Sequence, residues 1–129
     1  MIEPTVELAV NGTLMRGLEL NSNLLAIGAT FDREAETETA YRMWSIGDRH
    51  PAMIKVTKGG IAIPLEVWNV PLSGLTTILR QEPPGLCIGK VKLADGQEVL
   101  GVLGEPFLCE GHPEITTWGG WRLYCDRQF

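Results

Sequence analysis

Two glycines five residues apart, Gly12 and Gly17, frame a segment with the chemistry to hold an anion. They follow an apolar run, Val6–Val10, and a small hydroxyl residue, Thr13, lies just inside the first glycine. Glycine accepts a positive φ and lets another group approach the backbone, so this pattern predicts a turn whose amides face a shared space. The residues expected to bind a ligand here are Asn11, Gly12, Thr13, Leu14 and Gly17. An ordinary turn is the alternative, because this glycine spacing alone is not specific.

Glu66 is a candidate for proton transfer because it interrupts the apolar run Ile61–Val70. Burying a lone carboxylate is costly, so Glu66 must find a donor, emerge at an edge or serve a site. In a pocket shared with the glycine loop, its carboxylate would accept hydrogen bonds from the nitrogen end of a ligand. We expect a raised pKa for Glu66 if burial outweighs its donors.

Composition excludes several classes of protein. The formal charge of −5 and the absence of a Lys/Arg cluster argue against a nucleic-acid partner. No apolar run approaches the roughly 20 residues of a membrane span, and the start of the chain lacks the features of a signal peptide, so we expect a cytoplasmic protein. The three cysteines are widely separated, which favours reduced thiols over a disulfide or zinc site: Cys87, Cys109 and Cys125. We expect neither a metal nor a cofactor.

The 129 residues predict one domain, residues 1–129, built from short strands and one clear helix. Strands are expected at 6–10, 24–31, 40–46, 53–56, 61–70, 86–93 and 98–105, with a tight hairpin turn at 94–96. The helix begins near residues 70–73, where leucine and isoleucine recur at helical spacing, and ends at Pro83–Pro84. A solvated loop or strand edge is expected at 32–39, and a glycine-permitted bend at 115–124. This order indicates an α+β fold with a mixed, barrel-like sheet and few helices.

The run Asn11–Gly17 resembles the Tyr-Gly-(Ser/Thr)-Leu-x-x-Gly loop of the gamma-glutamylcyclotransferase-like proteins. A longer resemblance, to the C-terminal domain of allophanate hydrolase, covers nearly the whole chain. There the pattern Gly-Ala-His-x-x-Gly-x-Pro-Leu-Asn lies on Gly12 to Asn21, and further similar phrases are Glu66-Val67-Trp68, Leu86-Cys87-Ile88-Gly89 and Gly119-Gly120-Trp121-Arg122-Leu123-Tyr124. The resemblance implies a gamma-glutamylcyclotransferase-like fold.

The resemblance also implies roles for particular residues. The loop backbone would bind the carboxylate end of a small substrate, and Tyr41, at the place of a Tyr-Arg-Leu-Tyr phrase, would face the pocket. Glu82 is the nearest match to the glutamate that serves cyclotransferases as general acid and base. Leu14 stands where the family pattern has the histidine associated with decarboxylation of N-carboxycarbamate. The resemblance therefore does not extend to that reaction.

Two classes of function remain open from the sequence. The first is a small-molecule pocket protein or enzyme that takes a carboxylate- or carbamate-bearing metabolite, with Glu66 or Glu82 handling protons. The second is a non-catalytic accessory domain that binds an amidase partner, and a homodimer is the other assembly left open. His50, beside Pro51 in a polar turn, is expected to be a surface histidine rather than a catalytic one.

Overall fold

The computed structural model describes residues 3–128, so residues 1, 2 and 129 of the predicted domain lie outside the described part. The strands are β1 (Thr5–Val10), β2 (Thr30–Glu36), β3 (Tyr41–Ile46), β4 (His50–Lys55), β5 (Pro64–Pro71), β6 (Leu86–Lys92) and β7 (Glu98–Gly104). The helices are α1 (Asn21–Ala26), α2 (Leu72–Gln81), α3 (Pro106–Cys109) and α4 (Trp121–Gln128), with a 3-10 turn, η1, at Thr116–Trp118.

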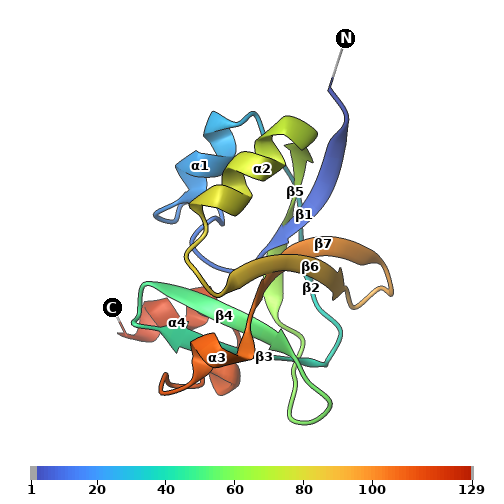
Figure 1. Cartoon of the computed structure of the whole chain (residues 1–129). Helices are drawn as coiled ribbons and strands as arrows, with labels where there is room; N and C mark the ends of the chain where they lie inside the picture. The colour runs from blue at the N-terminus through green and yellow to red at the C-terminus, as the bar shows by residue number, and fades with distance from the viewer. Residues whose placement is uncertain (1–2, 129) are drawn as a thin grey trace.

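Strand β1 is the centre of a five-stranded sheet with the order β2-β5-β1-β7-β6. It pairs antiparallel with β5 and parallel with β7, and its apolar end, Leu8–Val10, is fully buried. The sheet curls until its two edges meet, since Thr37 bridges to Leu93 and the Glu38 amide donates to the Lys92 carbonyl at 3.0 Å. The predicted α+β fold with a mixed, barrel-like sheet is confirmed (Figure 1).

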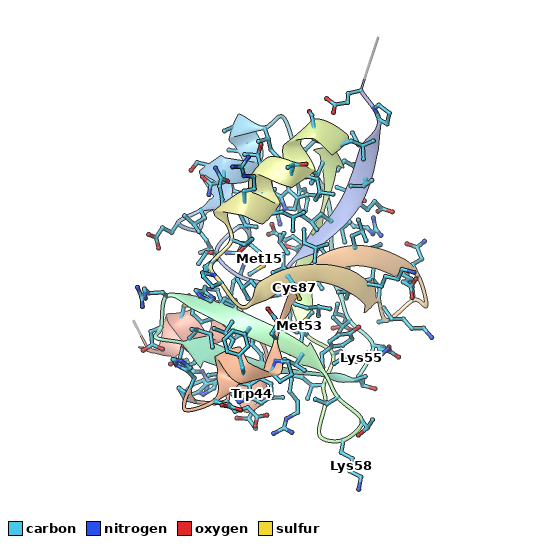
Figure 2. The ribbon with its side chains drawn as sticks, viewed as in Figure 1. Met15, Trp44, Met53, Lys55, Lys58 and Cys87 are labelled. Atoms are coloured by element: carbon cyan, nitrogen blue, oxygen red, sulfur yellow. The ribbon has the colours of Figure 1, made fainter. Side chains whose placement is uncertain are left out.

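Strands β3 and β4 form a separate two-stranded sheet below the curled one (Figure 1). It packs against β7 and α3. Met53 belongs to β4 of this hairpin, and Figure 2 shows Lys58 at the tip of a loop that projects away from the rest of the molecule. Because Met53 is buried in the main hydrophobic core, the hairpin is part of that core and not an appendage.

Helices α1 and α2 lie side by side at the other end of the molecule, over β1 and β5 (Figure 1). Helix α2 buries Ile78 in the core. Its N-terminus is held by Glu3, whose carboxylate accepts the Ser73 amide at 2.6 Å and the Ser73 hydroxyl at 3.0 Å. A carboxylate at this position satisfies an otherwise unpaired amide and complements the helix dipole. Glu3 therefore fixes the start of α2 to the segment that leads into β1.

The predicted strand at 24–31 is wrong. Residues 21–26 form α1, in which Leu24 is buried and Leu25 is exposed, and the strand begins only at Thr30. A short apolar run does not by itself distinguish a strand from a helix. Strand β2 lacks such a run because it is an edge strand that alternates exposed and half-buried residues. Likewise the predicted bend at 115–124 is η1 followed by α4. The helix at α2 and the β6–β7 hairpin are confirmed.

Candidate functional site

A small cavity of about 20 Å³ lies where the loop after β1 meets the end of α2. Its lining residues come from five segments: Val10, Asn11, Gly12, Thr13, Leu14, His50, Pro51, Glu82, Leu86 and Val102. The structure therefore brings four of the predicted loop residues, Asn11 to Leu14, together with Glu82. Gly17 is not among the lining residues, and its φ of +76° serves the turn that ends the loop.

The loop keeps its shape by using its carbonyl groups. The Met15 amide donates to the Gly12 carbonyl at 3.0 Å, and the Leu20 amide donates to the Thr13 carbonyl at 3.0 Å. The Asn21 side chain donates to the Leu14 carbonyl at 2.8 Å. Among the described residues, none accepts a hydrogen bond from the amides of Gly12, Thr13 or Leu14. Three consecutive donors without a described acceptor therefore remain in a loop that lines the cavity.

Gly12 lets the β3–β4 hairpin close onto this loop. A Cβ atom at Gly12 would lie 2.5 Å from the Cδ atom of Pro51, a distance that no ordinary side chain tolerates. The contact makes Pro51 and its neighbour His50 part of the cavity wall. His50 is half-buried there, so the sequence-based expectation of a surface histidine missed its position. Nothing local marks it, because its place depends on a contact between residues 12 and 51.

Glu82 lies just beyond α2, where an extended backbone (φ −68°, ψ 142°) turns the chain into Pro83. Its carboxylate has no hydrogen-bond or ion-pair partner among the described residues. Burial raises the pKa of Glu82 to about 7. A carboxyl group with this pKa can both donate and accept a proton near neutral pH.

A larger cleft of about 320 Å³ adjoins the cavity. Three residues line both hollows, namely Thr13, His50 and Glu82. The cleft adds Arg49 and Glu19, and Arg49 has no carboxylate partner in the described part of the chain. The cavity and the cleft therefore adjoin each other, and the cleft is large enough for a small metabolite.

Glu66 lies on the other side of the loop and is fully engaged. Its Oε1 accepts hydrogen bonds from the Arg16 amide at 2.9 Å and the Trp68 indole at 3.1 Å. Its Oε2 accepts from the guanidinium groups of Arg16 and Arg122, each at 3.1 Å. Burial pushes the pKa of Glu66 upward, but these four hydrogen bonds outweigh burial and hold the pKa below its ordinary value. The condition for a raised pKa, burial that outweighs the donors, is therefore not met.

The surroundings of Glu66 are a second hollow, a groove of about 410 Å³. It is lined mainly by β5, the edge of β2 and the first turn of α4: Met15, Glu34, Ala35, Pro64, Leu65, Glu66, Gly119, Gly120, Trp121, Arg122, Leu123 and Asp126. Glu66 and Glu82 therefore do not share one pocket. The loop lies between them, with Leu14 on the Glu82 side and Met15 on the Glu66 side.

Tyr41 is placed away from both hollows. Its side chain is fully buried in the core, and its hydroxyl accepts a hydrogen bond from the Lys92 amide at 3.1 Å. It lines neither the loop cavity nor the adjoining cleft. The hydroxyl thus joins β3 to β6, and the pocket-facing position that the resemblance implied is not what the structure shows.

The thiols and acidic groups give no sign of a metal centre within residues 3–128, where no three His, Cys, Asp or Glu side chains cluster suitably. Burial raises the pKa of Cys87 and Cys125, and raises that of Cys109 to about 11. Thiols with such pKa values stay protonated and are weak nucleophiles. In the same part of the chain, no helix has the length and apolar character to cross a bilayer.

Comparison with known proteins defines the fold class first. An AIG2-like protein from Mus musculus is 17% identical and superposes with a TM-score of 0.65, covering 88% of this chain and 87% of that one. At this identity the likeness concerns the fold alone. The curled sheet with few helices is accordingly a gamma-glutamylcyclotransferase-like fold.

The family follows from more similar proteins. The model of the allophanate hydrolase C-terminal domain matches residues 6–126, so the chain belongs to this family. The crystal structure of c4763, a protein from uropathogenic E. coli, is 56% identical with a TM-score of 0.93, covering 97% of this chain and 98% of that one. The urea amidolyase of Lachancea kluyveri is 30% identical over 131 residues, covering 96% of this chain. The chain spans only 7% of the length of that relative.

Proposed function

We propose that this protein binds a small carboxylate- or carbamate-bearing metabolite in the cavity between the Gly12–Leu14 loop and Glu82. The observation that carries the proposal is that hydrogen-bond donors and a carboxyl group line the same cavity. Three amides without acceptors offer hydrogen bonds to an anion, and a partnerless carboxyl group with a pKa of about 7 lines the same cavity. Perturbed titratable groups in a cleft mark functional sites more often than structural ones.

Glu82 is the group we assign to proton transfer. If the chain turns over its ligand, the carboxylate form takes a proton from the ligand's nitrogen and the acid form returns one, as in a gamma-glutamylcyclotransferase-like reaction. We assign Glu66 to holding the loop, because its two carboxylate oxygens already accept four hydrogen bonds from the protein. Leu14 is buried and apolar at the position of the family's histidine, so N-carboxycarbamate decarboxylation is not proposed.

A thermal-shift and calorimetric screen tests the proposal. The ligands are 5-oxoproline, gamma-glutamyl amino acids, malonate and biuret, because a ligand selective for the folded state raises the unfolding midpoint. We expect a hit whose affinity falls at least tenfold in Thr13→Trp, which fills the cavity, and in Glu82→Gln. Glu34→Gln, in the other groove, is the matched control and keeps the affinity. A flat screen with folded protein would remove the proposal.

A second candidate function is binding to an amidase. The observation that favours it is the relative called urea amidolyase, in which a segment like this chain forms a small part of a much longer protein. An amidase encoded nearby should then co-elute with this chain in size-exclusion chromatography. Elution of the chain alone at the mass of a monomer or of a homodimer would count against an amidase partner and would settle which of the two assemblies forms.

A further inference from the structure

Apart from Glu82, His50 is the ionisable side chain among the lining residues of the cavity, and the proposed function leaves it unused. It lines both the small cavity and the adjoining cleft, beside Thr13 and Glu82. Its Nδ1 atom lies 3.1 Å from the Pro51 carbonyl oxygen. A carbonyl oxygen only accepts, so Nδ1 carries the proton and Nε2 of the neutral ring has a free lone pair. No described residue donates to Nε2.

The position of this imidazole is fixed before any ligand arrives. The Pro51 ring is seated against Gly12, and the turn before His50 is anchored by Asp48. The Asp48 carboxylate accepts hydrogen bonds from the Ser45 hydroxyl and the Tyr124 hydroxyl, both at 2.6 Å. These contacts tie the hairpin to the loop on one side and to α4 on the other. A preorganised acceptor of this kind adds selectivity with little ordering cost.

We propose that His50 is a further ligand-contacting residue of the cavity, and that its Nε2 accepts a hydrogen bond from an N–H group of the ligand. This inference rests on the proposed function, because the ligand's carboxylate is taken to lie at the loop amides. With donors at one end and an acceptor at the other, the site selects carboxylates that carry a neighbouring amide, lactam or carbamate N–H. Carboxylates without an N–H are bound less tightly.

A matched pair of ligands tests the selectivity. The lactam 5-oxoproline has the N–H, and its lactone analogue, 5-oxotetrahydrofuran-2-carboxylate, has an oxygen in the same place. We expect the wild-type protein to bind the lactam about five- to tenfold more tightly, the worth of one ordinary hydrogen bond. His50→Phe keeps the ring volume and should lose most of the preference for the lactam. His50→Gln returns an acceptor near the place of Nε2 and should restore part of the preference.

The other histidine, His112, provides the control, because the chain has only two histidines. His112→Gln should keep the full preference for the lactam. Equal binding of the two ligands by the wild-type protein overturns the role of His50 and leaves the proposed function standing. Failure of both ligands to bind overturns the proposed function, and the role of His50 with it.

A measurement without ligand tests the ring itself. Nitrogen-15 NMR of the imidazoles should show the Nδ1–H tautomer for His50. An Nε2–H tautomer contradicts the assignment, because the Pro51 carbonyl oxygen can only accept the proton of Nδ1.

Discussion

Glu66 and Glu82 lie on opposite sides of one loop, and their pKa values are shifted in opposite directions. Glu66 is almost fully buried, yet its pKa is lowered because four donors meet its two oxygens. Glu82 is less buried, yet its pKa is raised to about 7 because no donor compensates its burial. Depth of burial therefore does not identify the group available for proton transfer. The presence or absence of partners does.

The same contrast divides the loop itself. On the Glu66 side, both backbone groups of Arg16 are held, the amide by Glu66 at 2.9 Å and the carbonyl by Arg122 at 2.7 Å. On the Glu82 side, the amides of Gly12, Thr13 and Leu14 are left without described acceptors. One side of the loop is held by side chains, and the other is the side to which we assign the proposed ligand. The substitutions below test this division, from the largest expected effect to the smallest.

Glu66→Ala should lower the free energy of unfolding by about 3 kcal/mol, since it removes the shared partner of Arg16 and Arg122 and leaves the Trp68 indole unpaired. Urea denaturation at pH 7 measures this. Because the folded pKa of Glu66 is lowered, its contribution is present above its unfolded pKa and disappears as the pH falls through the folded pKa. Glu82→Ala at pH 7 should show no comparable loss, and equal losses for the two variants would erase the distinction between them.

Gly12→Ala should cost about 2 kcal/mol, a typical penalty for overpacking, because the new methyl group meets the Pro51 ring. The hairpin must then move away from the loop, so His50 leaves the cavity wall. In NMR spectra, the amide and imidazole chemical shifts of residues 12–14 and 50–51 should change together, while the amide shifts of β6 should not change. A variant as stable as the wild type would show that loop and hairpin are not in firm contact.

Glu82→Gln should stabilise the protein by about 1.5 kcal/mol at pH 8 and by nothing at pH 4, after allowing for partial exposure to solvent. The folded pKa of about 7 lies above the ordinary 4.5 of a glutamate. Wild-type stability is therefore fullest below the unfolded pKa and is lost as the pH rises through 7, while the glutamine variant has no charge to bury. Thermal melts across this range measure the difference. Parallel pH profiles for the two proteins would contradict the assigned environment of Glu82.

Arg122→Met should cost about 1 kcal/mol, because it removes one hydrogen bond to the Arg16 carbonyl and one to Glu66. Hydrogen exchange of the loop amides should quicken. Glu34→Gln is the matched control, since Glu34 pairs only with the exposed guanidinium end of Arg16 and should change stability by less than about 0.5 kcal/mol. Equal effects of the two substitutions would mean that the charge network, and not the grip on the backbone, holds the loop.

The features that could be predicted from the sequence are local ones. The glycine spacing, the Asp95-Gly96 turn and the proline stop after α2 act within a few residues, and the structure contains each of them. The resemblance added the fold and the nearness of Glu82 to the loop. The apolar run at 24–31 misled because helix and strand share such runs.

The environment of a side chain depends on contacts that no local pattern records. Arg16 and Arg122, which lower the pKa of Glu66, are 50 and 56 residues away from it along the chain. The resemblance predicts that Tyr41 faces a pocket, whereas its hydroxyl lies in the core and accepts a hydrogen bond from β6. His50 lines the cavity because its neighbour Pro51 packs directly against Gly12, which has no side chain. Which glutamate carboxylate finds hydrogen-bond donors therefore depends on contacts that form only in the folded protein.

The central place of β1 has a consequence for synthesis on the ribosome. This strand precedes both of its partners in the chain, since the antiparallel partner is complete only at Pro71 and the parallel partner only at Gly104. Until Pro71 has been added, its apolar half has no complete partner strand in the curled sheet. Sheets that depend on such distant pairings fold slowly and expose strand edges on the way. The nascent chain therefore presents an unpaired apolar strand until β5 has been synthesised, and binding by a chaperone before that point would be most useful at residues 5–10.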